Sequence, residues 1–128
     1  MIDRSKTRVL AIDPGKTCGW STSHYGYGAK PEGEFLSWLF RILGTDLFDR
    51  VVIERFHTRT LTKDGEETLK VIGAIKFICD IRRIEHQMVN PDAKKKTIKE
   101  VSNEIRNRHS VDAEAIRLWD LRYGHWNK

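Results

Sequence analysis

Three carboxylates and one imidazole stand where strands would end and a helix would begin. Asp13 and Glu54 each follow a short apolar run, a pattern typical of a buried strand that delivers an acid to the edge of a sheet. His109 and Asp112 are three residues apart, so on a helix their side chains project from one face. We therefore expect the four residues to form one site, built from two strand ends and one helix.

The chemistry that suits such a cluster depends on metal ions. Carboxylates that lie close together are costly unless cations stand between them. Oxygen ligands suit Mg²⁺ or Mn²⁺, and two such ions about 3.5 to 4 Å apart can activate a water and stabilise the leaving oxygen in phosphodiester hydrolysis. A purely structural role is the alternative for some of these residues. Asp13 could simply cap a turn, and a lone histidine near an aspartate is often structural.

The elements that must hold these residues follow from the apolar patterns between them. Pro14 and Gly15 predict a turn after Asp13, so the second strand should run antiparallel to the first. A strand reached through a helix should lie parallel to the first one. We predict strands over 9–13, 18–23, 25–29, 49–54 and 86–90, and helices over 34–43, 67–84 and 106–123. The fold class is α/β, with a five-stranded mixed sheet in which an antiparallel N-terminal meander is joined to parallel strands.

The predicted helix over 67–84 is apolar around most of its circumference. Lys76, Asp80 and Arg83 share one narrow polar stripe, while apolar side chains cover most of the rest. A helix needs an apolar stripe of only about 100° to face its own core. Self-association is the simplest explanation, and the alternative is that both sides pack inside the monomer. The preceding stretch, 55–66, is polar and rich in threonine and predicts an exposed loop beside Glu54.

Length and composition limit the class of protein. A chain of 128 residues is long enough for one domain, 1–128, and too short for two. With 32% charged residues and no long apolar run, it has no membrane span, and its N-terminus lacks the apolar segment of a secretory signal. Cys18 and Cys79 lie far apart, outside any metal-binding spacing. They suggest buried thiols in a reducing compartment, so we expect a cytoplasmic protein.

Positive charge is concentrated after the predicted strand 86–90. The chain carries a formal net charge of +5, and Lys94, Lys95, Lys96 and Lys99 follow one another closely. Such a segment favours a polyanionic partner, although many charge runs are only a solvated surface.

Taken together, these residues resemble the RuvC-like Holliday junction resolvases of the RNase H-like superfamily, in a compact form of the kind found in phages. The resemblance extends over nearly the whole chain in the same order and strand context. It is carried by Ala11-Ile12-Asp13-Pro14-Gly15 with Gly19-Trp20, by Val52-Ile53-Glu54, and by His109-x-x-Asp112-Ala113. It implies an RNase H-like fold, with helices on both faces of the sheet.

The resemblance also implies a function and a set of roles. In the family, a homodimer cuts four-way or branched DNA junctions with paired nicks, and the long helix corresponding to 67–84 forms the dimer interface. The family's ligands of two Mg²⁺ ions correspond to Asp13, Glu54, His109 and Asp112, which makes these the expected catalytic and metal-binding residues. The residues expected to contact DNA are Arg55, Phe56, Lys94, Lys95, Lys96 and Lys99, with Phe56 in the place of an aromatic residue that inserts at the junction.

Three other classes of protein share part of this pattern. Actin-like ATPases and sugar kinases also begin with a strand, an Asp and a Gly-rich turn, but they need two such domains. A YqgF-type nuclease of the same fold that acts on RNA remains open. A protein that binds junctions through its basic face without cutting them is disfavoured, because clustered acids facing phosphates would weaken its binding.

Overall fold

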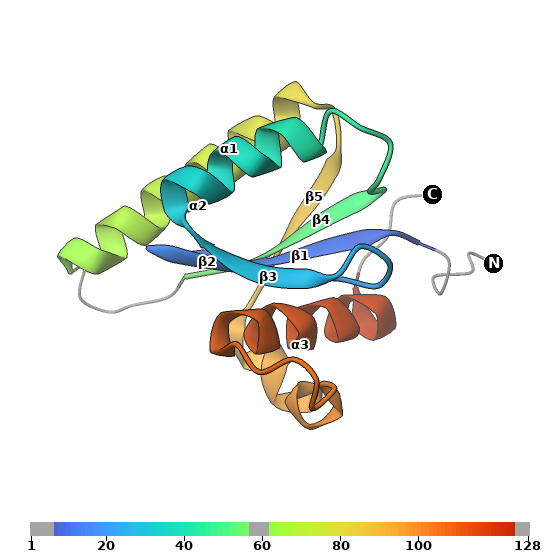
Figure 1. Cartoon of the computed structure of the whole chain (residues 1–128). Coiled ribbons are helices and arrows are strands. Elements are labelled where there is room, and N and C mark those ends of the chain that lie inside the picture. Colours follow the sequence, from blue (N-terminus) through green and yellow to red (C-terminus); the bar gives the residue numbers. More distant parts are fainter. Residues whose placement is uncertain (1–6, 57–61, 125–128) are drawn as a thin grey trace.

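The fold is built on one mixed sheet (Figure 1). The structure is a computed structural model that describes residues 7–56 and 62–124. In this part of the chain the sheet has five strands in the order β3-β2-β1-β4-β5. The strands are β1 (Val9–Asp13), β2 (Thr17–Thr22), β3 (Tyr27–Pro31), β4 (Arg50–Glu54) and β5 (Glu85–Val89). β1, β2 and β3 form an antiparallel meander, and β4 is parallel to both β1 and β5, which confirms the predicted fold class.

Helices cover both faces of the sheet (Figure 1). One face carries α1 (Glu32–Ile42) and α2 (Lys63–Ile81). The other carries α3 (Arg108–Tyr123), with the 3₁₀ helices η2 (Pro91–Lys96) and η3 (Ile98–Glu100) beside it. Among the described residues, no helix combines the length and apolarity that crossing a bilayer requires.

Capping side chains explain why two helices begin away from their predicted first residues. The Thr62 hydroxyl accepts a hydrogen bond from the Gly65 N–H at 3.0 Å, so α2 begins at Lys63 and the polar loop after Glu54 is shorter than predicted. Residues 57–61 of that loop lie outside the described residues. At the other helix, the Asn107 side chain accepts from the N–H groups of His109 and Ser110, and α3 therefore begins at Arg108.

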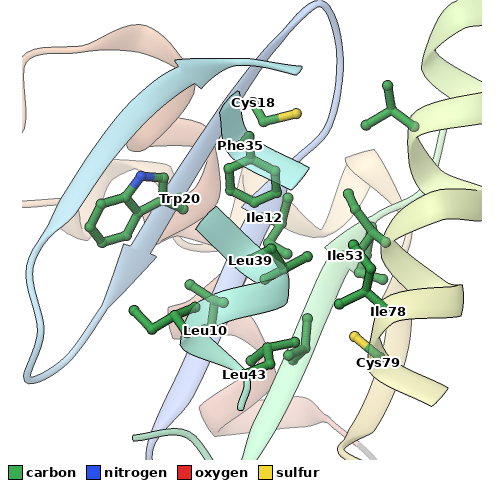
Figure 2. Close-up of a cluster of buried hydrophobic side chains, with 14 of the residues drawn as sticks. Leu10, Ile12, Cys18, Trp20, Phe35, Leu39, Leu43, Ile53, Ile78 and Cys79 are labelled. Atoms are coloured by element: carbon green, nitrogen blue, oxygen red, sulfur yellow. The ribbon is translucent and has the colours of Figure 1, made fainter. Parts of the chain in front are cut away.

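Two apolar layers hold the sheet, one on each face. Alternate residues of β1 and β4 point to opposite faces, and both faces are covered, which explains why residues 9–12 and 51–53 are apolar without interruption. Ile12 and Ile53 pack toward Leu39 of α1 and Ile78 of α2 (Figure 2). The smaller layer lies under α3 and consists mainly of Val9, Ala11, Val52, Val89, Ala93, Ala113 and Ile116.

The apolar circumference of α2 is divided between the core and solvent. Ile75 and Ile78 are buried in the monomer, whereas Phe77 is 64% exposed and Ile81 is 49% exposed. One apolar side of the helix therefore packs on the sheet, and the other faces outward.

Candidate active site

Asp13 and Glu54 are neighbours at the carboxyl ends of two parallel strands. In the register of β1 and β4, Ile12 lies beside Ile53, so the acid that follows each isoleucine ends its strand at the same edge of the sheet. The Glu54 carboxyl group lies close enough to that of Asp13 to raise its pKa. Their side chains are only 15% and 9% exposed, so the sheet presents a largely buried pair of acids.

The first turn of α3 adds the other two predicted residues. The His109 Nδ1 atom lies 3.3 Å from Oδ2 of Asp13. Asp112, one turn further along the helix, interacts electrostatically with Asp13. The structure thus brings Asp13, Glu54, His109 and Asp112 together, as the sequence predicted.

Lys94 also belongs to this cluster, which the sequence did not indicate. Its Nζ atom lies 2.5 Å from Oε1 of Glu54 and 3.6 Å from Oδ2 of Asp112. The sequence grouped Lys94 with Lys95 and Lys96 as a DNA-contacting run, and that role stays a prediction. In the structure the ammonium group of Lys94 has carboxylate partners inside the site.

A pocket of about 230 Å³ opens beside the two strand-end acids. It is lined by Asp13, Pro14, Glu54, Arg55, Phe56, Thr68, Pro91 and Lys94. Phe56 is partly buried because its ring packs against Gly65 at the start of α2, where an added Cβ would lie 3.0 Å from the ring. Nothing in the sequence marks Thr68 as a residue of the site. It lines the pocket because the first turns of α2 lie beside it.

The charges of the site raise the pKa of one of its acids. Burial, followed by the hydrogen bond and charge of Glu54 and the charge of Asp112, raises the pKa of Asp13 from 3.8 to about 9, with Lys94 acting in the opposite direction. Burial lowers the pKa of Lys94, but Glu54, Asp112 and Asp13 together raise it above its ordinary value. The cluster therefore has an excess of negative charge that further positive charge would stabilise.

The donor set fits a divalent cation in its chemistry. Three carboxylates and an imidazole are suitable ligands for Mg²⁺ or Mn²⁺. In the described ranges, no three His, Cys, Asp or Glu side chains are grouped as ligands of one ion. The Lys94 ammonium instead contacts Glu54 and Asp112. Binding an ion here would require these side chains to rearrange.

The remaining residues predicted to contact DNA lie partly at the pocket and partly on η2 and η3. Lys95, Lys96 and Lys99 are exposed on η2 and η3. Lys95 forms an exposed ion pair with Asp92, and the Lys96 Nζ atom lies 5.1 Å from the centre of the Tyr123 ring. Arg55 is exposed and lines the pocket. Their contacts with DNA stay predictions.

Comparison with known proteins identifies the fold. No protein-family model matches the sequence, and no curated protein matches it. Solved structures do match: Thermus thermophilus RuvC in complex with a Holliday junction substrate superposes with a TM-score of 0.73 at 16% identity, over 88% of this chain and 91% of RuvC. The chain has the RuvC fold. A second T. thermophilus RuvC structure gives a TM-score of 0.71 at 15% identity, over 92% of this chain and 97% of RuvC.

A third solved structure matches with a lower TM-score. The yeast mitochondrial Holliday junction resolvase Ydc2 superposes with a TM-score of 0.53 at 13% identity, over 88% of this chain and 62% of Ydc2. The predicted resemblance to RuvC is therefore confirmed for the fold, which is retained although few residues are identical.

Proposed function

We propose that the protein is a metal-dependent endonuclease that resolves four-way or branched DNA junctions. The observation that carries this proposal is the cluster of Asp13, Glu54, His109 and Asp112 at the strand ends of a RuvC fold. One RuvC with this fold has been solved in complex with a Holliday junction substrate. Two acids at one sheet edge and a third on α3 beside them are costly for a protein that only binds phosphates, and this favours a nuclease over a non-catalytic binder.

Each residue of the cluster has a role in the proposed reaction. Asp13, Glu54 and Asp112 would hold two Mg²⁺ ions, which Mn²⁺ could replace, and His109 would complete the ligand set. Bound ions of this kind activate a water and stabilise the leaving oxygen of a phosphodiester. The His109 ring lies against one oxygen of Asp13 and so orients that carboxylate.

The proposed DNA surface has two parts. Lys95, Lys96 and Lys99 would contact phosphates on the side of η2 and η3, and Arg55 and Phe56 would contact DNA at the pocket itself. These cations contribute to the net charge of +5, which favours a polyanionic partner. Phosphate contacts would position the DNA without reading its sequence.

A homodimer through α2 would give the paired nicks. The outward side of the helix exposes Phe77 and Ile81, and exposed apolar side chains of this size are typical of an interface when they lie together. A two-fold dimer presents two copies of the Asp13 site in a symmetric relation. This arrangement matches the two strand cuts that a four-way junction requires.

The deciding experiment compares substrates and variants. A labelled four-way DNA junction and a linear duplex of the same sequence are incubated with the protein, with and without Mg²⁺. We expect paired cuts in the junction alone, and only with Mg²⁺. Asp13→Asn and Glu54→Gln should lose cleavage and keep junction binding, because they remove metal ligands and leave the basic surface intact. Asp46→Asn is the control, since this acid is 99% exposed and pairs with Arg8.

Two results would contradict the proposal. Wild-type cleavage by Asp13→Asn or Glu54→Gln would remove the acids from the mechanism. A four-way RNA junction that is cut in preference to the DNA junction would instead support the YqgF-type alternative.

A further inference from the structure

The Lys94 side chain contacts the carboxylates of the site, whereas the side chains of its neighbours Lys95 and Lys96 do not. We propose that Lys94 is the built-in counter-cation of the site, and that a divalent ion must displace its ammonium group from Glu54 and Asp112 in order to bind. The inference rests on the proposed metal-dependent function. It assigns Lys94 a role separate from the phosphate contacts of Lys95 and Lys96.

The contacts of Lys94 place its charge on the oxygens that a metal ion would need. Its Nζ atom lies 2.5 Å from Oε1 of Glu54, a hydrogen-bond distance, and 3.6 Å from Oδ2 of Asp112. Hydrogen bonds between ionised partners are roughly twice as strong as neutral ones. A divalent ion and the ammonium group would repel each other if both lay against the Glu54 carboxylate in this largely buried site, so they compete for it.

The backbone that carries Lys94 is fixed by its surroundings. In a 3₁₀ helix, residues three apart lie on the same side, and both Pro91 and Lys94 line the pocket. Ala93 is buried in the core under α3. At the end of η2, the Thr97 hydroxyl donates a 2.6 Å hydrogen bond to the Ala115 carbonyl of α3. The side chain of Lys94 is therefore directed toward the acids by a docked helix.

The neighbouring lysines show that this placement is specific to one position. The Lys94 side chain is 22% exposed, whereas that of Lys95 is 82% exposed and forms only a surface ion pair with Asp92. Lys96 is exposed near the Tyr123 ring. Three successive lysines thus occupy three different environments, and only Lys94 contacts the acids among the three.

The competition has a consequence for the substrate. Because η2 is docked, a displaced Lys94 ammonium stays at the pocket that it lines, beside Pro91 and Arg55. A phosphate entering this pocket would offer the ammonium new oxygen partners. Metal binding would then move the Lys94 charge from carboxylates to the substrate, so that Lys94 acts as a positioning residue in the loaded site.

Metal binding without DNA tests the proposal directly. Mn²⁺ affinity is measured by electron paramagnetic resonance for the wild type, Lys94→Met, Lys94→Arg and Lys95→Met. We expect Lys94→Met to bind Mn²⁺ roughly tenfold more tightly, which corresponds to about 1.4 kcal/mol, because the competing charge is gone. Lys94→Arg keeps a cation and should bind as the wild type does. Lys95→Met removes an exposed charge and is the matched control.

Thermal unfolding gives a second readout. Without metal, Lys94→Met should melt at a lower temperature than the wild type, because Glu54 loses its charged partner in a buried position. Added Mn²⁺ should raise its melting temperature by more than it raises that of the wild type, since tighter binding stabilises the folded state more. A variant with reduced metal-free stability that gained nothing extra from Mn²⁺ would show a merely structural lysine and overturn the proposal.

The outcomes separate this proposal from the proposed function. If the wild type binds Mn²⁺ and cuts junctions while Lys94→Met binds the ion equally or more weakly, the displacement proposal is wrong and the nuclease function stands. If the wild type neither binds Mn²⁺ nor cuts with it, the proposed function fails. In that case Mn²⁺ binding by Lys94→Met would support competition between the ion and the Lys94 ammonium group. The absence of Mn²⁺ binding by this variant would overturn the displacement proposal as well.

Discussion

The backbone of His109 lies directly against Gly19. Gly19 is paired with Asp13 across β2 and β1, and a Cβ added at Gly19 would collide with the carbonyl group of His109 and approach its Cβ to 2.5 Å. The first turn of α3 can therefore reach the sheet only because position 19 has no side chain. This close approach sets the distance between the His109 ring and the Asp13 carboxylate.

Gly19→Ala should accordingly disturb both the fold and the site. The added methyl group meets backbone atoms that cannot rotate away, so α3 must shift, and we expect the free energy of unfolding to fall by about 1 to 3 kcal/mol. Cleavage should fall as well, because His109 and Asp112 move with the helix. Urea denaturation and the junction assay measure the two effects.

A glycine in open space provides the control for that substitution. Gly33 lies in α1, where an added Cβ would meet no atom within 4 Å. Gly33→Ala should be neutral or stabilise the protein by about 0.5 to 1 kcal/mol. If Gly19→Ala behaves like this control, the contact with His109 does not determine how α3 docks.

The positions of the four acidic and imidazole residues could be predicted because local patterns mark them. Asp13 and Glu54 each end an apolar run, and a parallel pair of strands must bring such ends to one edge. His109 and Asp112 are one helical turn apart. None of these steps requires knowledge of how distant side chains pack, and the structure accordingly brings the four residues together.

Other features depend on packing that the sequence pattern does not contain. In the sequence nothing distinguishes Lys94 from Lys95 and Lys96, and only the docking of η2 directs its side chain toward Glu54. Arg50 and Asp120, 70 residues apart, form a buried ion pair with an Nε to Oδ2 distance of 3.1 Å, although either would ordinarily be placed at the surface. The helical wheel of α2 likewise shows a wide apolar surface without showing which side meets the sheet.

The raised pKa of Asp13 makes the metal-free protein sensitive to pH. The folded protein holds a proton on Asp13 up to about pH 9, whereas the unfolded chain releases it near the ordinary value of 3.8. The folded state thus binds more protons within this window, so its stability should fall as the pH rises from about 4 to about 9. Above about pH 9, Asp13 is deprotonated in both the folded and the unfolded state, so its ionisation no longer changes the stability.

Asp13→Asn should remove this dependence. Asparagine keeps the shape of the side chain and carries no charge, so at pH 8 in EDTA the variant should exceed the wild type in free energy of unfolding by at least about 1.4 kcal/mol, the value of one pKa unit. At pH 4 the difference should largely disappear. Urea denaturation at the two pH values measures it, and equal stability at pH 8 would contradict the raised pKa.

The exposed lysines of η2 and η3 should act through phosphates alone. Changing Lys95, Lys96 and Lys99 together to Ala should weaken binding to junction and duplex alike, and should reduce the salt dependence by about 0.9 in slope for each phosphate that is no longer neutralised. Binding measured across a salt series tests this. Arg41→Ala, on the opposite face in α1, should leave the slope unchanged. A triple variant with the wild-type slope would mean that these lysines are only a solvated surface.

The exposed side of α2 should hold the proposed dimer together. Charges at Ile75 or Ile78 would unfold the monomer, because both side chains are buried in its own core. Phe77 and Ile81, four residues apart and exposed, lie on one outward side of the helix. Phe77→Asp should therefore leave the monomer folded and separate the dimer, because the interface would have to bury an unpaired carboxylate.

Light scattering and the junction assay together test this interface. Phe77→Asp should be a folded monomer that nicks single strands of a four-way junction and no longer makes paired cuts, since paired cuts need two symmetric sites in one complex. Ile98→Asp, at an exposed apolar position in η3 on the other face of the sheet, should remain dimeric. A Phe77→Asp variant that stays dimeric, or a wild type that is monomeric at the concentrations at which it makes paired cuts, would show that α2 is not the interface.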